Sequence, residues 1–329
     1  MTVKEKITQL FTQNTEWTVH ELTDKLGASK QMVHIALNQL IEEGQLQKLG
    51  RTPKTVYKIP SAASNMQKDK TVSIFTAQEE DYLQHHWLQV TATGDLLEGA
   101  AAFSYWCNQR KEPLLKTLVE YQKTRIKYDA YFEEDGSING MEKLRNTKGY
   151  ENIWLDDLHY MDFYAIKRFG KTRLGTLLHC AKQGQSLPLM RRMLTEIEPR
   201  IKDFVKIHDV DAVGFIPPTV RREVQLMKVL AGGLKLPLPV VNIKKMSGLI
   251  PVPQKSLPKL QERIDNASGS FIVTEKRSFS HVLLIDDAVG SGSTLNQVAE
   301  KIKNKQTAQR VSGLAIVGSF KGFDVITDV

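Results

Sequence analysis

The sequence has little cysteine and no long apolar run among its 329 residues. Cys107 and Cys180 lie far apart, and neither has a Cys or His neighbour at ligand spacing, which excludes a disulfide framework and a cysteine-rich zinc site. No run approaches the roughly 18 apolar residues of a membrane-spanning helix. The first residues form a charged amphipathic stretch instead of an apolar signal core. We therefore expect no membrane insertion and a cytoplasmic location.

Acidic residues are in the minority, with 37 Asp and Glu against 45 Lys and Arg, so the formal net charge is +8. This balance favours a polyanionic partner: a nucleic acid, a phosphorylated ligand or an anionic membrane surface. The chain is also too long for one ordinary hydrophobic core, and we expect two or three domains.

Composition and hydrophobic pattern divide the chain into four parts. Residues 1–59 alternate short helical patterns with one basic turn, and the small polar residues that follow indicate a linker over 60–77. Residues 78–150 look mainly helical, and we expect their aromatic side chains to form a core; by position, this region is a candidate hood over the site described below. Residues 151–329 form the last domain.

Short apolar runs alternate with helical patterns in the last third of the chain, which is typical of a parallel sheet covered on both faces. The predicted strands are 212–216, 239–243, 271–274, 282–285 and 313–319, and the predicted helices lie near 221–234 and 294–305.

The first 59 residues contain three amphipathic helical patterns followed by two short strand patterns. The first helix covers 2–13, Thr18 caps the second, and Ser29 caps the third, which ends at Gly44. Strands are predicted at 46–49 and 56–59, around a basic turn. This order of elements resembles a winged helix-turn-helix domain.

Two groups of residues in this segment suit nucleic-acid contacts. The third helix offers side chains that can reach base edges in a major groove: Lys30, Gln31, His34 and Asn38. The ribbon offers cations for phosphates: Lys48, Arg51, Lys54 and Lys58, with no acidic residue from 44 to 68. The expected partner is DNA or an RNA–DNA hybrid. The alternative is a module for protein contacts, including assembly of a homo-oligomer.

Residues 281–294, HVLLIDDAVGSGST, combine an apolar strand, two acids and a loop that leads into a helix. The predicted phosphate loop consists of Ala288, Val289, Gly290, Ser291, Gly292, Ser293 and Thr294. Glycines let successive N–H groups converge on one anion, and the helix directs its positive end at the same place. Asp286 and Asp287 can accept hydrogen bonds from sugar hydroxyls. Phosphate at the loop and ribose at the acids correspond to a ribose 5-phosphate.

Other loop chemistries explain this segment less well. A Walker loop needs Lys followed by Ser or Thr after its last glycine, and a dinucleotide fingerprint needs a third glycine where Leu295 stands. A plain flexible turn would explain the glycines but not the paired acids.

The segment resembles the phosphoribosyl pyrophosphate (PRPP) motif of type I phosphoribosyltransferases. The resemblance implies an α/β fold with a phosphoribosyltransferase-like parallel sheet flanked by helices. It also implies that Asp286 and Asp287 are the catalytic acids at the ribose hydroxyls, and that the loop holds the 5′-phosphate. The sequence departs from the family at Gly290-Ser291-Gly292, where Thr-Thr-Gly is usual.

Further motifs, spread over residues 160–320, resemble the ComF-like branch of this superfamily. They are Tyr164 to Gly170, Phe215 to Arg222 with Gln225, and the set Pro253, Gln254, Leu257, Glu262, Arg263, Asn266, Gly269 and Phe271. ComF proteins often begin with a cysteine-rich zinc element, and this chain has the winged-helix pattern instead. The DNA-uptake role of that branch is therefore not carried over.

Departure of pyrophosphate from the sugar leaves positive charge on the ring and requires cations at the leaving group. The predicted pyrophosphate side consists of Pro218, Thr219, Arg221 and Arg222, after a strand end on the same side of the sheet as Asp286. A lid is predicted from Lys255, Lys259 and Arg263; the alternative is a solvated charged loop. Mg²⁺ is expected through the oxygens of the ligand, with no metal ligand from protein side chains.

The combination of domains resembles ribosyltransferase/DNA-binding effectors that accompany retron reverse transcriptases in antiviral defence. This resemblance implies a reverse transcriptase with its non-coding RNA as partner. The alternative is a transcription regulator that senses PRPP without catalysis. A housekeeping salvage enzyme is a third possibility, against which the winged-helix pattern argues.

Overall fold

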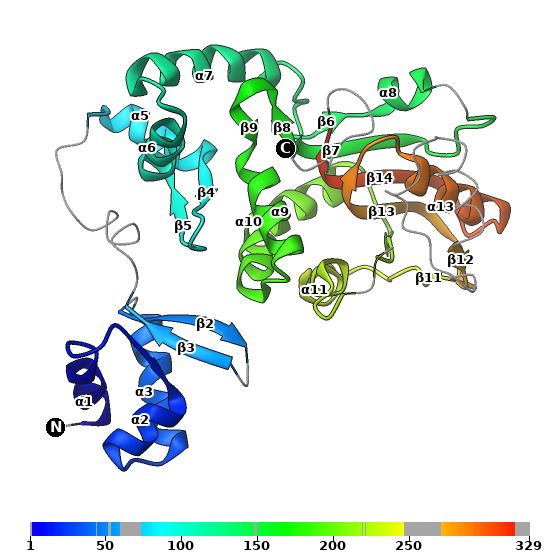
Figure 1. Ribbon diagram of the computed structural model, residues 1–329. Coiled ribbons are helices and arrows are strands. Elements are labelled where there is room, and N and C mark those ends of the chain that lie inside the picture. Colours follow the sequence, from blue (N-terminus) through cyan, green and yellow to red (C-terminus); the bar gives the residue numbers. More distant parts are fainter. Residues whose placement is uncertain are drawn as a thin grey trace. The chain divides into compact units, whose positions relative to one another are not determined.

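The computed structural model describes residues 2–43, 45–51, 54–59, 74–147, 150–218, 220, 222–246 and 271–319 (Figure 1). The chain divides into two compact units, residues 1–76 with 90–97 and residues 77–89 with 98–329. Within the described ranges, no helix is both long and apolar enough to cross a membrane.

The described part of the first unit contains three helices and a three-stranded antiparallel sheet. In chain order these are α1 (Val3–Leu10), β1 (Glu16–Thr18), α2 (Val19–Leu26), α3 (Lys30–Glu42), β2 (Gln47–Arg51) and β3 (Lys54–Lys58). The three predicted helices and two predicted strands are thus present, with β2 extending further than expected. Strand β1 was not predicted, because three residues are too short for a periodic pattern; it pairs with β3.

Helices α2 and α3 begin at the capping residues that the sequence predicts. The Thr18 hydroxyl accepts a hydrogen bond from the Glu21 amide at 3.3 Å, and the Ser29 hydroxyl accepts one from the Met32 amide at 3.3 Å. Gly27 ends α2 in the left-handed region at φ 58°, which glycine adopts without strain. The helices and β3 enclose one apolar core: Ile7, Phe11, Trp17, Leu22, Val33, Ala36, Leu37, Leu40, Leu46 and Tyr57.

The region predicted as helical contains α5 (Ala77–His86), α6 (Gly99–Arg110) and α7 (Leu114–Asp129), but also a hairpin of β4 (Leu88–Val90) and β5 (Leu96–Glu98). Its aromatic residues form a core, as expected. The Trp87 ring lies 5.3 Å from Trp106 and 5.2 Å from Tyr121, and Tyr121 lies 5.1 Å from Phe169. Since Phe169 belongs to the α/β part of the chain, these helices pack onto that part.

The centre of the second unit is a five-stranded sheet in the order β10-β13-β14-β7-β6. Four strands run parallel: β10 (Ala212–Phe215), β13 (Phe279–Val289), β14 (Ala308–Gly318) and β7 (Asp157–Phe163). The edge strand β6 (Ile138–Asn139) is antiparallel to β7. The predicted α/β class is therefore confirmed as a mixed sheet with parallel strands.

Helices cover both faces of this sheet, so β14 is buried without interruption from Val311 to Gly318. The packing helices are α8 (Met141–Asn146) on β7, α9 (Arg173–Gln183) on β7 and β14, α11 (Leu226–Gly233) on β13, and α13 (Ser293–Asn304) on β14. Helix α10 (Leu187–Ile207) packs on α9 and α11. A small hairpin, β8 (Ala165–Ile166) and β9 (Gly170–Lys171), flanks a 3-10 turn at Lys167–Phe169 and precedes α9.

The strand predictions differ from the structure at three places. Strand β7 was missed, because His159, Tyr160 and Asp162 interrupt its apolar run. Residues 239–243 contribute only one bridge, from Val240 to Val213, before β11 begins at residue 243. The run 271–274 forms β12 (Phe271–Val273), which pairs with β11 (Ile243–Lys245) in a separate antiparallel pair and does not join the parallel sheet.

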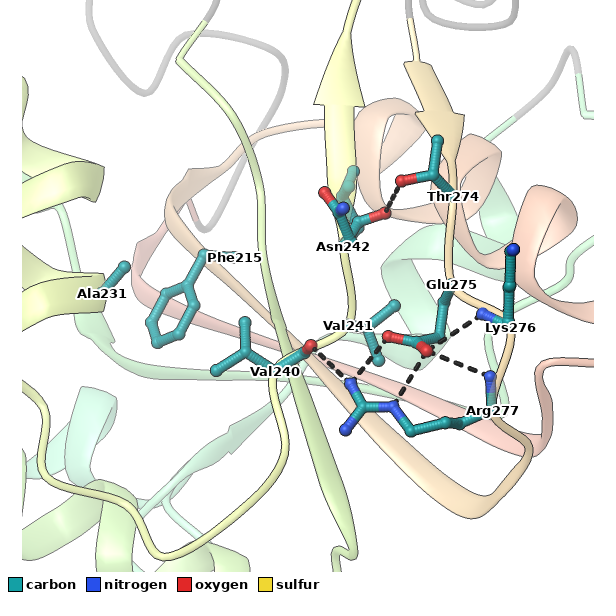
Figure 2. Close-up of a pocket in the computed structure, with 10 residues that line it drawn as sticks. Phe215, Ala231, Val240, Val241, Asn242, Thr274, Glu275, Lys276 and Arg277 are labelled. Carbon is teal, nitrogen blue, oxygen red and sulfur yellow. Dashed lines mark hydrogen bonds and ion pairs between the residues drawn. The ribbon is translucent and has the colours of Figure 1, made fainter.

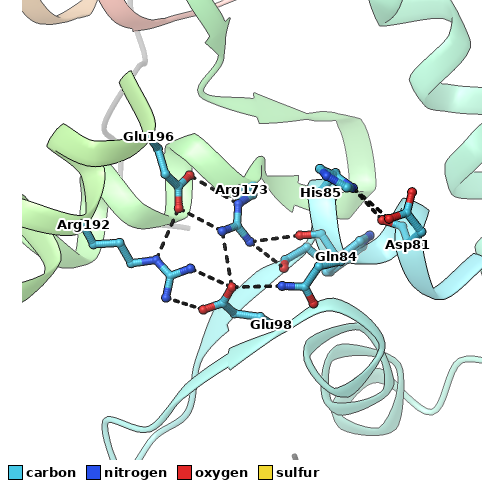
Figure 3. Close-up of polar contacts among 8 residues, drawn as sticks. Asp81, Gln84, His85, Glu98, Arg173, Arg192 and Glu196 are labelled. Atoms are coloured by element: carbon cyan, nitrogen blue, oxygen red, sulfur yellow. Dashed lines mark hydrogen bonds and ion pairs between the residues drawn. The ribbon is translucent and has the colours of Figure 1, made fainter. Parts of the chain in front are cut away.

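A network of charges joins the helical region to α9 and α10 (Figure 3). Arg173 at the start of α9 binds Glu98 at 3.3 Å and Glu196 at 2.9 Å, and also donates to the Gln84 carbonyl at 3.2 Å. Arg192 donates to the Glu98 carboxylate at 2.7 Å. The side chains of Glu98 and Arg173 are only 13% and 16% exposed, so removing Arg173 leaves two poorly solvated carboxylates with Arg192 as their one shared cation in this network.

We expect Arg173→Ala to lower the free energy of unfolding by about 3 kcal/mol, because Glu98 and Glu196 lose a shared cation. Chemical denaturation measures the change. Arg191→Ala is the matched control, since Arg191 is exposed on α10, and its effect should stay within about 0.5 kcal/mol. Equal effects of the two substitutions would contradict a stabilising role of the network.

Candidate functional site

The predicted strand–loop–helix segment is present, with boundaries that differ from those expected. Strand β13 continues through Val289, and Ala288 pairs with Val317 of β14. Helix α13 begins at Ser293, so Ser293 and Thr294 are helical. The loop itself is therefore limited to Gly290, Ser291 and Gly292, because β14 provides pairing partners beyond the two acids.

Glycine is required at position 292 for two reasons. Its φ of +81° lies in the left-handed region that other residues rarely adopt. A Cβ atom there would also come within 2.9 Å of Leu144 Cδ1 on α8. The tight turn brings the end of β13 directly to the positive end of α13.

The loop is held by hydrogen bonds to its own residues and to its neighbours. The Ser291 hydroxyl donates to the Ser293 hydroxyl at 3.2 Å, and the Tyr150 hydroxyl donates to the Ser291 carbonyl at 2.9 Å. The Ser319 amide donates to the Val289 carbonyl at 3.3 Å. These bonds fix the loop in one conformation without using the hydroxyl of Thr294, which is half-buried.

The two acids lie half-buried near the carboxyl end of β13. The Asp286 carboxylate accepts a hydrogen bond from the Asp287 amide at 2.8 Å. The Asp287 carboxylate forms an ion pair with the ammonium group of Lys182, from the last turn of α9. Lys182 was missed in the sequence, where a lysine near a helix end has no distinguishing signal.

Arg222, which the sequence analysis assigned to the pyrophosphate side, contacts the end of α9. Its guanidinium donates to the Lys182 carbonyl and, at 3.0 Å, to the Gln183 side-chain oxygen. Strand β10 lies beside β13, since the Ile216 amide donates to the Ile285 carbonyl at 2.9 Å. The structure thus brings together Arg222, Lys182 and Asp287 from three separate elements.

Thr219, Arg221, Lys255, Lys259 and Arg263 lie outside the described residues. Pro218 is half-buried in the segment after β10.

Lys143 of α8 is a further basic residue beside the loop. Its ammonium group donates to the carbonyl and hydroxyl oxygens of Ser319 at 2.6 and 2.9 Å, and burial lowers its pKa to about 8. With Gly290 and Ser291 it lines a cavity of about 10 Å³. That volume holds about one water molecule, so a phosphate group would have to bind on another side of the loop.

A larger hollow of about 680 Å³ lies beside β10, lined by residues of β10, α11, 240–243 and 274–277 (Figure 2). On its wall, the Glu275 carboxylate accepts hydrogen bonds from the side chain and the amide of Arg277, and these bonds lower the pKa of Glu275 to about 2. None of the residues 286–294 lines this hollow.

Possible metal ligands occur away from the loop. Glu133, Asp135 and His159 place one ligand atom each within 4.8 Å of one another. His208 extends this group, with Nε2 at 2.8 Å from the Asp135 carboxylate. The group shares no residue with the loop at 290–292, so it does not bear on Mg²⁺ carried by a ligand there.

The predicted nucleic-acid face of α3 is largely accessible. Lys30, Gln31 and Asn38 are exposed, and His34 is half-buried. The same helix also exposes Met32 and Ile35, which are 52% and 53% accessible. Apolar side chains of this kind suit thymine methyl groups as well as a protein partner.

On the ribbon, Lys48 is exposed, and the backbones of Arg51 and Lys54 pair across it at the turn. The side chains of Arg51 and Lys54 lie outside the described part of the structure.

No protein-family model matches the chain, and a search of curated proteins found no match.

The lowered pKa of Lys143 predicts a pH dependence of stability. In the native protein Lys143 loses its proton near pH 8, whereas in the unfolded chain it does so near pH 10.5. Between these two pH values the unfolded chain binds more protons than the native protein. The free energy of unfolding should therefore rise with pH, by at most about 3 kcal/mol.

Lys143→Met should remove this rise, because the replacement does not titrate. The measurement is the free energy of unfolding at pH 7.5 and pH 9.5, with Lys116→Met as an exposed control. If wild type and Lys143→Met show the same change between the two pH values, Lys143 is not the group responsible.

Proposed function

We propose that residues 286–294 bind a ribose 5-phosphate group and that the protein acts on PRPP as a phosphoribosyltransferase-like protein. The observation that carries this proposal is the position of two adjacent carboxylates near the end of β13, two residues before a tight loop and the start of α13. Carboxylates repel phosphate but accept hydrogen bonds from sugar hydroxyls, while a helix start favours phosphate. A ribose 5-phosphate has both groups at suitable positions.

In this proposal the backbone amides at 290–294 and the Thr294 hydroxyl bind the 5′-phosphate. Asp286 and Asp287 accept hydrogen bonds from the 2′- and 3′-hydroxyls of the ribose. Mg²⁺ is held mainly by ligand oxygens. Arg222 donates to the Lys182 carbonyl, and the ammonium group of Lys182 pairs with Asp287, so Arg222 is connected to that acid through Lys182. Its positive charge there would stabilise a departing pyrophosphate.

We further propose that the first unit binds DNA or an RNA–DNA hybrid as a winged helix. The order of α1, α2, α3 and a β-ribbon supports this proposal, as do the exposed polar side chains of α3. A DNA-binding unit joined to a ribosyltransferase-like unit suits an effector of a retron-type antiviral system, with a reverse transcriptase and its non-coding RNA as partners. A PRPP-sensing regulator would use the same two units without a chemical product.

The first test replaces both acids with amides. Asp286→Asn with Asp287→Asn preserves size but removes two charged acceptors, each worth about 1.5–3 kcal/mol, so the Kd for PRPP with Mg²⁺ should rise at least about 100-fold. Calorimetry measures binding, and pyrophosphate release in the presence of nucleotides or nucleic acid measures turnover. Glu80→Gln with Asp81→Asn, an exposed adjacent pair on α5, is the control.

Three outcomes distinguish an enzyme, a PRPP sensor and a protein without a ribose-phosphate site. Pyrophosphate release by wild type and its loss in the Asp286/Asp287 variant favour an enzyme. Binding of PRPP without release favours a sensor. No heat with PRPP, ribose 5-phosphate or nucleotides would show that the loop is not a ribose-phosphate site.

The second test concerns the first unit. Lys48→Ala with Arg51→Ala and Lys54→Ala should weaken binding to all duplex sequences alike and reduce the dependence of affinity on salt, because these cations meet phosphates. Gln31→Ala with Asn38→Ala should reduce sequence preference instead. Lys116→Ala is the control. If gel-shift titrations show no effect of either set, α3 and the ribbon serve protein contacts.

A further inference from the structure

The ion pair between Lys182 and Asp287 occupies one of the two carboxylates assigned to the ribose. Lys182 lies in the last turn of α9, and Asp287 lies in β13, 105 residues further along the chain. The two side chains are 21% and 13% exposed, so the pair is largely removed from solvent. A ribose hydroxyl that hydrogen-bonds Asp287 therefore competes with an ammonium group already bound there.

Breaking this pair without a replacement is costly, because each charge is then left poorly solvated. Asp287 would gain the ribose hydroxyls as partners. Lys182, however, needs another anion. A ribose 5-phosphate carries its only phosphate at the loop 290–292, at the other end of the sugar from C1. PRPP carries a second anion, the pyrophosphate on C1.

The backbone around Lys182 is fixed on the side where that second anion is expected. Arg222 donates to the Lys182 carbonyl and, at 3.0 Å, to the Gln183 side chain. This contact holds the end of α9 against the turn after β10. Lys182 can therefore exchange Asp287 for an anion near Arg222 by rotating its flexible side chain, without moving the helix.

We propose that Lys182 is the specificity-determining residue of the site, and that it selects a ligand with a pyrophosphate on C1 over the same sugar without one. This inference rests on the proposed ribose-phosphate function. In the free protein Lys182 neutralises Asp287, and on binding it transfers to the pyrophosphate and releases Asp287 to the ribose. A ligand that lacks the pyrophosphate offers Lys182 no anion, so Lys182 stays paired with Asp287 and competes with the ribose hydroxyls.

An ordinary explanation of the pair is that a lysine in the last turn of a helix stabilises the helix end. Lys303 offers a direct comparison, because it lies in the last turn of α13 and binds the Asp156 carboxylate at 2.8 Å. Its side chain is 23% exposed, close to the 21% of Lys182. Lys303→Met is therefore the matched control for the loss of a helix-end lysine.

The experiment compares the affinities of PRPP and ribose 5-phosphate, each with Mg²⁺, by calorimetry on the full chain. Lys182→Met should weaken PRPP binding about 10-fold or more, through loss of one charged hydrogen bond. It should leave ribose 5-phosphate binding unchanged or tighter, because Asp287 is no longer occupied. Lys182→Arg keeps the charge and should retain the preference for PRPP, and Lys303→Met should behave as wild type.

A parallel loss of affinity for both ligands in Lys182→Met, or an unchanged ratio between them, would overturn the proposed selection. If wild type binds neither ligand, the proposed function itself fails. Thermal melting of each variant reports folding. If Lys182→Met does not fold, Lys182→Gln is the replacement, and the same change in the affinity ratio is required of it.

Discussion

The parallel pairing of β13 between β10 and β14 fixes the position of the two acids and the loop in the candidate site. Residues 282–285 are fully buried in this pairing, with Ile285 beside Phe215 on one side and Leu314 on the other. Burying such side chains is worth about 1.5–3 kcal/mol each, and a shift by one residue would turn every side chain to the opposite face. Asp286 and Asp287 follow directly, so the same pairing holds them next to the turn at 290–292.

Helix α9 connects this site to the helical region. Arg173 at its start binds Glu98 and Glu196, and Lys182 in its last turn binds Asp287. A single helix therefore carries both the charge that anchors the region at 77–129 and the charge that neutralises an acid of the site.

The sequence predicted the elements whose signals are local. Thr18 and Ser29 indicate helix starts because their hydroxyls can cap a helix. The continuous apolar run at 282–285 predicts a buried strand. Strand β7 was not predictable in this way, because its Asp162 is paired with Arg125, 37 residues earlier in the chain, at 3.3 Å. Lys182 was missed for the same reason, since its partner Asp287 is distant in sequence. The roles of Asp162 and Lys182 depend on contacts that form only in the folded chain.

A crystal structure of the protein with PRPP and Mg²⁺ would show whether the segment 286–294 holds a ribose phosphate. We expect the 5′-phosphate at the amides of 290–294 and the ribose hydroxyls at Asp286 and Asp287. We also expect the Lys182 ammonium group at the pyrophosphate instead of at Asp287. Ligand bound in the hollow beside β10 with the Lys182–Asp287 pair intact, or no bound ligand at saturating concentration, would rule out a ribose-phosphate site at this segment.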